Sequence, residues 1–395
     1  MRIKVKLLEE EVDLDVPRKS EVHQIETDVF GLQEDVEEID PIEILEGYTI
    51  GSKVAVIVDV DLRNPTYREF VDLMVSRLHS LGAFDDEIIL FFTNKVHPES
   101  VPSMYLYRYN CIFSKEFEGR PKAYVTLSSL KDLNIEVHRI FERNFSKGYE
   151  ARIHSAYIIS EAYIDGIYGI RTGLMALFDF LSPQTLRALI EYRIKHGLQD
   201  FVHLVRSLKT LPPFSFVNGG IVFMRDFSGR IVSNIAGDTS KIHDEVINKY
   251  LSAYAYYPIE TYDVLLLGAV SGRPENLHRA LVFTDEISKE NGTVVLYAKR
   301  WTLDPDFESI ISRFLTVDEE DVKIKSYKEA VAYEVAKILS RKTILLVGEG
   351  KSQLFETFSD TQEALDIALE KAFTATSRPK IGVMAYADCA FPAPR

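Results

Sequence analysis

The sequence has little of what marks several large classes of protein. Only two of its 395 residues are cysteines, Cys111 and Cys389, and their spacing is not that of a metal site. A disulfide between them stays open, but so few cysteines favour a cytoplasmic protein. No uninterrupted run of 18 apolar residues is present, so we expect no membrane partner. The N-terminus also lacks the apolar core and the small-residue cleavage site of a signal peptide.

Basic residues and local metal motifs are scarce as well. Lysine and arginine number 46 against 60 aspartate and glutamate residues, which gives a formal net charge of −14. Because nucleic-acid binding requires a basic face, we expect no nucleic-acid partner, although a local basic site for a small anion is compatible with this balance. The nine histidines form no H-E-x-x-H motif and no cluster with cysteine, so the sequence predicts no metal site of that kind.

What the sequence does contain is a clear strand–helix–strand unit. Two apolar runs, 54–58 and 88–92, flank a helix, and each run ends in a polar turn. We place the apolar stripe of this helix at Phe70, Leu73, Met74, Leu78 and the stem of Arg77. Strands joined in this way are normally parallel, and ligands of open α/β sheets bind at the carboxyl edge. The polar side chains that we expect to converge at this edge are Asp59, Asp61, Arg63, Lys95 and His97.

The remaining segments indicate two domains of the α/β class. Residues 9–47 are acidic and weakly patterned, which predicts a solvated connection. A β-hairpin is expected over 214–235. A linker at 256–261 divides the chain into an N-terminal domain, 1–258, and a C-terminal domain, 259–395. Strands and helices alternate after this linker, so we expect a mostly parallel sheet flanked by helices in each domain.

Two glycine-rich turns suggest a different function. Residues 348–352 end like a phosphate loop, but the first glycine of that pattern falls on Leu345, so a plain turn is the favoured interpretation. Residues 268–274 follow a strand and precede a helix, where backbone N–H groups could hold an anion. A nucleotide-binding enzyme that uses this second turn is therefore an alternative.

Residues 58–66 read V-D-V-D-L-R-N-P-T, and residues 90–97 read L-F-F-T-N-K-V-H. Together with three later segments, they resemble the nickel-dependent lactate racemase family. Residues 58–66 are similar to its aspartate-x-threonine-arginine-proline turn. Residues 90–97 are similar to its alanine-threonine-glycine-x-histidine turn, with one extra residue. Residues 228–243, 264–274 and 380–392 match its later segments in order and spacing, so the resemblance covers nearly the whole chain.

This resemblance implies a two-domain α/β architecture with the active site in the cleft between the domains. The family abstracts a hydride from the α-carbon of a 2-hydroxy acid with a nickel-pincer nucleotide, and histidine exchanges the hydroxyl proton. By motif position, Arg63 would hold the substrate carboxylate and His97 would be the catalytic acid or base. The same frame yields further substrate-binding candidates, Asp61, Lys95 and Arg279, and cofactor-binding candidates, Asp59, Arg171 and Thr172.

The segment that should carry the cofactor departs from the family. Alignment on Gly166 and Gly169 puts Ala162 at the second histidine and Thr172 at the lysine that tethers the cofactor. Alanine cannot transfer a proton, and threonine cannot form the lysine-type thioamide link. The resemblance therefore implies that the cofactor is untethered or absent.

The sequence thus predicts a divergent relative of 2-hydroxy acid racemases that binds a small carboxylate. If the protein is active, it is an isomerase of the racemase or epimerase type. The alternative is a non-catalytic binding or partner protein on the same scaffold. Lys95 and Arg171 are the residues that could replace the missing lysine. The substrate, any bound metal and a homo-oligomeric state are left open.

Overall fold

The computed structural model divides the chain into two compact units. It describes residues 1–26, 31–32, 34–93, 95–113, 123–125, 135–137, 153–180, 183–208, 217–227, 229–257, 260–318, 322–324 and 326–392. Unit 1 comprises Met1–Gly31, Asp165–Gly169 and Leu251–Arg395, and unit 2 comprises Leu32–Ile164 and Ile170–Tyr250. Within the described ranges, no helix is both long and apolar enough to cross a membrane.

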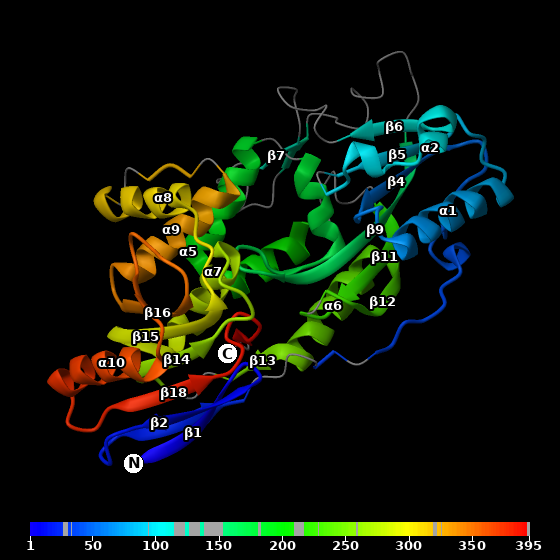
Figure 1. Ribbon diagram of the computed structural model, residues 1–395. Coiled ribbons are helices and arrows are strands. Elements are labelled where there is room, and N and C mark those ends of the chain that lie inside the picture. Colours follow the sequence, from blue (N-terminus) through cyan, green and yellow to red (C-terminus); the bar gives the residue numbers. More distant parts are fainter. Residues whose placement is uncertain are drawn as a thin grey trace. The chain divides into compact units, whose positions relative to one another are not determined.

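Unit 2 is built on a seven-stranded sheet with the order β12-β11-β9-β4-β5-β6, in which β10 pairs with β9 (Figure 1). Its strands are β4 (Lys53–Asp59), β5 (Ile88–Phe92), β6 (Asn110–Phe113), β9 (Ile153–Asp165), β10 (Gly169–Arg171), β11 (Val217–Arg225) and β12 (Ile231–Asp238). The predicted parallel pairing of the first two apolar runs is confirmed, with register from Val54↔Ile88 to Val58↔Phe92. The predicted hairpin is also confirmed, because β11 and β12 pair antiparallel.

Helices complete unit 2, together with a small antiparallel pair of strands. These elements are η1 (Pro41–Glu43), α1 (Pro65–Ser80), η2 (Pro98–Ser100), α2 (Ser103–Arg108), β7 (Ala123–Val125), β8 (Ile135–Val137), η4 (Gly173–Phe180), α5 (Pro183–Leu208) and α6 (Thr239–Tyr254). Helix α1 begins where Asn64 accepts a hydrogen bond from the backbone N–H of Thr66, with Pro65 at the first helical position. Asn64 and Pro65 lie in the segment that follows β4, so they determine where the helix begins and where the chain leaves the edge of the sheet.

The buried stripe of α1 differs from the expected one. The residues that pack on the sheet are Tyr67, Val71, Met74, Val75 and Leu78. Leu73 is instead 41% exposed, and Phe70 is half-buried. Met74 and Leu78 of the expected stripe are buried, and the rings of Tyr67 and Phe70 lie 5.1 and 5.6 Å from that of Phe223 in the sheet, so the expected stripe is wrong at Leu73.

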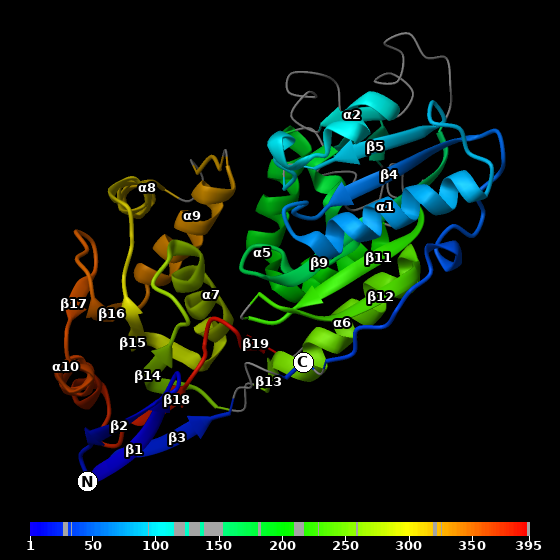
Figure 2. The ribbon, with the colours of Figure 1, turned by 45° about the vertical axis from the view of Figure 1, so that its right-hand side comes forward.

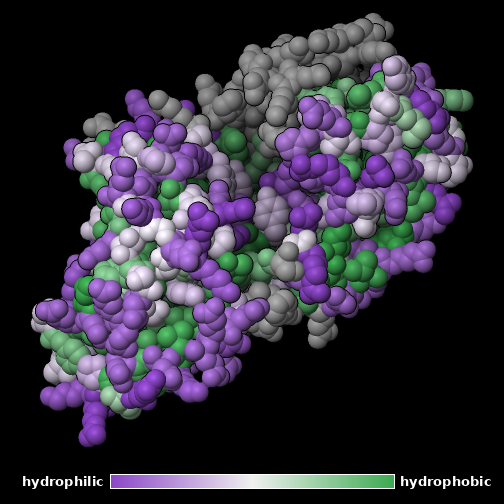
Figure 3. Space-filling model, viewed as in Figure 1, coloured by the Kyte–Doolittle hydropathy of each residue, from purple (hydrophilic) through white to green (hydrophobic). Residues whose placement is uncertain are grey.

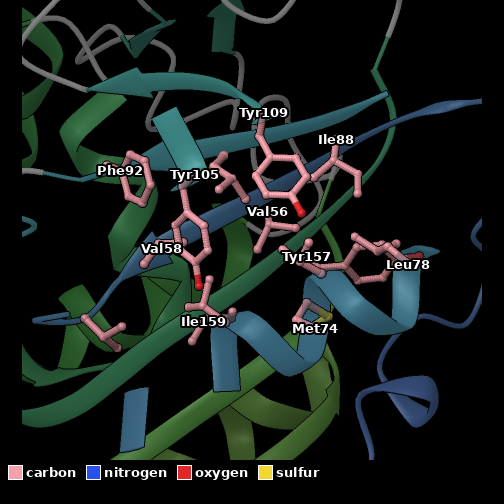
Figure 4. Packing of buried hydrophobic residues seen from close by; sticks show 14 of the residues in the cluster. Val56, Val58, Met74, Leu78, Ile88, Phe92, Tyr105, Tyr109, Tyr157 and Ile159 are labelled. Atoms are coloured by element: carbon pink, nitrogen blue, oxygen red, sulfur yellow. The ribbon is translucent and has the colours of Figure 1, made fainter. Parts of the chain in front are cut away.

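One hydrophobic core lies between α1, α2 and this face of the sheet. Figure 4 shows Met74 and Leu78 of α1 directed at Val56, Ile88 and Ile159 of the strands, with Tyr105 and Tyr109 of the α2 region beside them. Burying such side chains contributes about 25 cal/mol per Å² of apolar surface removed from water, so this core holds the βαβ unit rigidly. The rigid unit in turn holds the polar turns that follow its strands.

Unit 1 contains a six-stranded parallel sheet with the order β17-β16-β15-β14-β18-β3. Its strands are β3 (Glu21–Ile25), β14 (Tyr262–Gly268), β15 (Ser288–Arg300), β16 (Thr343–Glu349), β17 (Glu356–Phe358) and β18 (Lys380–Met384). The other elements are β1 (Arg2–Leu7), β2 (Glu10–Asp15), β13 (Ala255–Tyr256), α7 (Pro274–Thr284), η6 (Asp285–Ile287), α8 (Pro305–Thr316), α9 (Tyr327–Leu339), α10 (Thr361–Ala375) and β19 (Phe391–Pro392).

Helices cover both faces of this sheet. Figure 2 shows α10 on one side of it and α7, α8 and α9 on the other. The β1–β2 hairpin shares a core with α10, through Val5, Leu14 and Leu365 among others. Side chains on the face of unit 1 seen in Figure 3 are mostly hydrophilic, as the high proportion of charged residues leads one to expect.

The N-terminal segment is where the structure departs most from expectation. The predicted solvated connection over 9–47 is wrong in its first half, which contains β2 and β3, whereas residues 34–38 are exposed as expected. Strand β3 pairs in parallel with β18, from Glu21↔Lys380 to Ile25↔Met384, and this long-range pairing places Met1–Gly31 in unit 1. The units therefore do not follow a single cut in the sequence; the expected boundary residue, 258, lies outside the described residues.

Candidate functional site

Charged side chains gather at the carboxyl edge of the unit 2 sheet. Strands β4, β5, β9 and β11 run parallel, so their carboxyl ends share one edge. Asp59 ends β4, Lys95 follows β5, Glu161 lies in the last part of β9, and Arg225 ends β11. Arg171 reaches the same place from β10. The backbone thus delivers five ionisable groups to one location.

Asp59 is the most deeply buried member of this group, with no exposed surface. Its Oδ1 accepts a hydrogen bond of 2.7 Å from Thr93 Oγ1. Arg171 Nη2 donates to both carboxylate oxygens at 3.1 Å, and Lys95 Nζ lies 3.5 Å from Oδ2. Burying a carboxylate is costly unless it is paired and hydrogen-bonded, and these three partners meet that requirement.

Glu161 is the second buried carboxylate and is held in a similar way. Tyr67 donates its hydroxyl to Oε2 at 3.0 Å, and Lys95 Nζ donates to Oε1 at 3.3 Å. Arg225 Nε lies 2.8 Å from Oε2 and also donates to the Tyr67 hydroxyl at 3.0 Å. Lys95 therefore bridges both carboxylates.

We call the series Arg171–Asp59–Lys95–Glu161–Arg225 the ion chain. Its cations outnumber its anions by one, and they are also the more exposed groups. The exposed fractions of the side chains are 0% and 10% for the carboxylates and 12%, 19% and 28% for Arg171, Lys95 and Arg225. Lys95 and Arg171 also lie over the ring of Tyr163, at 4.6 and 5.6 Å from its centroid. An edge that buries its negative charge and presents positive charge suits a small anion.

The pKa values of Tyr67 and Arg225 are both raised by their surroundings. Burial raises the pKa of Tyr67 well above its usual value, and the charge of Glu161 adds to this effect while Arg225 opposes it. Tyr67 therefore stays a hydrogen-bond donor. Burial lowers the pKa of Arg225, but Glu161 and Tyr67 raise it more, so the net shift is upward and Arg225 stays charged.

A second, more exposed group lies in the turns that follow β4 and β5. Arg63 donates from Nε to Asp61 Oδ1 at 2.9 Å and from Nη2 to Oδ2 at 2.5 Å. The pKa of Asp61 is lowered, chiefly by this side-chain hydrogen bond from Arg63, with burial opposing and the charge of His97 contributing. His97 itself is exposed, and no side-chain hydrogen bond is formed by it within the described residues.

The structure thus brings together most of the residues expected at this edge. Asp59, Lys95 and Arg171 belong to the ion chain, while the pair Asp61–Arg63 and His97 occupy the neighbouring turns. Arg279 belongs instead to unit 1, on α7, where its Nη2 lies 3.8 Å from Asp388.

Three members of the site, Glu161, Tyr67 and Arg225, were missed by sequence reasoning. Strand β9 continues to Asp165, and Glu161 lies in its polar last part, which carries no continuous apolar run. The alternation of Glu161 with Tyr163 was the signal that could have found it, since residues two apart share a face. Arg225 carries no comparable signal, because only its pairing partner places it at the edge.

The residues at the cofactor positions do not fit the tethered group that the resemblance implies. Thr172 is fully buried, and its hydroxyl lies 2.8 Å from Nδ1 of His243. Ala162 is likewise buried, and its carbonyl accepts a hydrogen bond from the hydroxyl of Tyr250. Neither position offers an amine or an imidazole. Within the described residues, no group of three or more His, Cys, Asp or Glu side chains is arranged to hold a metal ion.

The two glycine-rich turns have structural explanations. A Cβ at Gly272 would lie 2.1 Å from the carbonyl oxygen of Arg300, so this glycine permits close packing of two backbones. In the other turn, the hydroxyl of Ser352 donates to Glu308 and accepts hydrogen bonds from the N–H groups of Leu354 and Phe355. Packing and turn formation therefore account for both segments.

This architecture is shared with a protein of known structure. No family model matches the chain, and no curated protein matches it by sequence. Among solved structures it is similar to the lactate racemase apoprotein from Thermoanaerobacterium thermosaccharolyticum, with a TM-score of 0.65 over 100% of both chains. The chain has the fold of lactate racemase. At 13% sequence identity this likeness concerns the fold alone, and it confirms the predicted α/β class with mostly parallel sheets flanked by helices.

Proposed function

We propose that the protein is a divergent relative of lactate racemase that binds a small 2-hydroxy acid or a related carboxylate at the carboxyl edge of the unit 2 sheet. The observation that carries this proposal is the ion chain, whose anions are buried and whose surplus positive charge is exposed. Arg63 stands beside it with its guanidinium oriented by Asp61. Arginine presents a planar fork that matches a carboxylate, and Asp61 reduces the ordering needed to form that pairing.

The binding role is supported better than the family's full chemistry. Thr172 and Ala162 stand where the resemblance requires a lysine and a histidine. We therefore propose that substrate-type binding is retained without the tethered cofactor. In this proposal Lys95 assists Arg63, and Asp59 and Arg171 keep Lys95 in place instead of contacting a cofactor.

A second candidate is an isomerase of the racemase or epimerase type, with His97 as its acid or base. It is favoured by one observation: His97 is exposed in the turn after β5, where its charge helps to lower the pKa of Asp61, the residue that orients Arg63. A histidine beside the carboxylate-binding arginine could exchange a proton with the hydroxyl of a bound 2-hydroxy acid, because its unperturbed pKa is close to neutrality.

Isothermal titration of the full chain with lactate, glycolate and 2-hydroxybutyrate tests the binding proposal. We expect Arg63→Gln to weaken binding by about 10- to 100-fold, since charge-assisted hydrogen bonds contribute about 1.5–3 kcal/mol. Arg230→Gln is the matched control, because Arg230 is also an exposed arginine held by a nearby aspartate, Asp226, and lies in the β11–β12 turn. Failure of every acid to bind, or unchanged binding by Arg63→Gln, would contradict the proposal.

Chiral chromatography of a single enantiomer incubated with the protein tests the second candidate. An isomerase should erode the optical purity of the ligand, and His97→Gln should abolish this turnover while the Kd changes by less than about twofold. If the wild-type protein binds the acid but its optical purity persists, the non-catalytic alternative holds.

A further inference from the structure

The far end of Arg225 has no partner in the part of unit 2 that the structure describes. Its Nε is engaged by Tyr67 and Glu161, at 3.0 and 2.8 Å. Its two terminal amino groups, Nη1 and Nη2, donate no hydrogen bond to any described residue. The side chain is 28% exposed, so these N–H groups are accessible from outside the sheet.

The engaged and free parts of Arg225 have different roles. The contacts at Nε come from Tyr67 on α1 and Glu161 on β9, two elements joined to β11 through the core and the sheet. The guanidinium carbon of Arg225 also lies 5.5 Å from the centroid of the Tyr67 ring. Together, these contacts fix the guanidinium plane. A guanidinium that is fixed at one end and free at the other is preorganised to receive an anion bidentately.

Lys95 adds to the positive charge at this position. It contacts the same glutamate as Arg225, with Nζ 3.3 Å from Oε1 of Glu161. These two cations share a single carboxylate partner there, and the other carboxylate that Lys95 contacts, Asp59, is also paired with Arg171. The excess positive charge of the ion chain is therefore available beside Arg225.

This position is distinct from the one at Arg63. Arg63 is 66% exposed and is neutralised by its own partner, Asp61. Arg63 follows β4 and Arg225 ends β11, so both lie at the same carboxyl edge of the sheet, and the charge of Asp61 helps to raise the pKa of Arg225. Each arginine is oriented by a different acid, and each can meet a separate anionic group.

We propose that the ligand carries two anionic groups, one received by Arg63 and the other by the terminal amino groups of Arg225 with Lys95, and hence that the site favours a small dicarboxylate over a monocarboxylate. This inference rests on the proposed function, because it deepens the chemistry of the same site. The second carboxylate completes the hydrogen bonding of a guanidinium that is otherwise left to water.

A pair of ligands that differ only at the second group tests the inference. Malate and 2-hydroxybutyrate have the same chain length, but malate has a carboxylate where 2-hydroxybutyrate has a methyl group. By isothermal titration of the full chain, we expect malate to bind at least about tenfold more tightly, as one charge-assisted pairing requires. Arg225→Gln should remove this preference, because it should weaken the binding of malate by at least about tenfold more than the binding of 2-hydroxybutyrate.

Two further variants control for indirect effects of replacing Arg225. Arg225→Lys keeps the charge beside Glu161 but loses the fork, so it should fold normally and retain only part of the preference. Arg230→Gln, on the exposed turn that follows β11, should retain all of it. Thermal unfolding of each variant verifies that the compared proteins are folded.

The outcomes separate this inference from the proposed function. Equal affinity of the wild-type protein for both acids, or an equal loss of both in Arg225→Gln, overturns the second anionic position and leaves carboxylate binding standing. Failure of both acids, and of the monocarboxylates above, overturns the proposed function and this inference with it.

Discussion

The carboxyl edges of the parallel strands in the two sheets surround a buried aspartate with different partners. In unit 2, the fully buried Asp59 has a hydroxyl donor and two cations within 3.5 Å. In unit 1, Asp388 is just as deeply buried after β18, and its nearest cation is Arg279 at 3.8 Å. Its closer partners are neutral: the backbone N–H of Val270 and the side-chain amide of Asn276.

Each edge also holds one aspartate whose pKa is shifted, and the two shifts have opposite directions. Burial raises the pKa of Asp388, and Arg279, Asn276 and Val270 offset only part of this rise. At the unit 2 edge, the pKa of Asp61 is lowered, chiefly by its hydrogen bond from Arg63. The same architecture therefore supports a closed polar core in one unit and a surplus of exposed cations in the other. Only the second arrangement suits the capture of an anion.

The largest effect is expected from removing the central cation of the ion chain. Lys95→Met leaves Asp59 and Glu161 each with one cation fewer, and breaking a buried ion pair typically costs 3–5 kcal/mol. Because Arg171 and Arg225 remain, we expect the free energy of unfolding in urea to fall by about 3 kcal/mol. Lys351→Met, at an exposed lysine in the turn after β16 of unit 1, should change it by less than about 0.5 kcal/mol. If both substitutions lowered the free energy of unfolding equally, the buried ion pairs would not distinguish the unit 2 edge from unit 1.

A smaller loss is expected from the hydroxyl that links α1 to the ion chain. Tyr67→Phe keeps the ring packed on Phe223 but removes the donor to Glu161 and the acceptor for Arg225. We expect urea unfolding to report a loss of about 1–3 kcal/mol, because partners of a buried polar group are left unsatisfied. An unchanged free energy of unfolding would show that water replaces the hydroxyl and that this edge is less enclosed than unit 1.

The smallest effects on the free energy of unfolding are expected from replacing Asp388 and Asp61, and the two effects should change with pH in opposite directions. Asp388 has a raised pKa in the folded state, so its contribution to stability is present below the ordinary pKa of aspartate and is lost as pH rises through the raised value. Relative to wild type, Asp388→Asn should therefore gain stability as pH rises.

Asp61 follows the opposite rule, because its pKa is lowered. Its contribution is present above the ordinary pKa and is lost as pH falls through the lowered value, so Asp61→Asn should be least different from wild type in acid. Urea unfolding of both variants between about pH 3 and pH 7 measures the two trends. Parallel trends would contradict the contrast between the edges.

Much of the framework could be predicted from local patterns. The runs at 54–58 and 88–92 became β4 and β5, and the alternation of strands and helices after residue 260 became the unit 1 sheet. Strong apolar periodicity and turn residues carry this information, because each strand and helix buries one stretch of sequence. Leu73 of α1 was misjudged because the packing of this helix on Phe223, through Tyr67 and Phe70, joins residues far apart in the chain.

By itself, the sequence determined the polar turns after β4 and β5, and hence Asp59, Arg63, Lys95 and His97 as neighbours at one edge. Only the tertiary structure decided their partners. Glu161 and Arg225 come from strands about 100 and 170 residues after β4, and parallel pairing alone brings them to Lys95. Likewise, β3 joins unit 1 only through β18 at the other end of the chain. Short-range patterns specify strands and turns, whereas hydrogen bonding between distant strands specifies which charges meet.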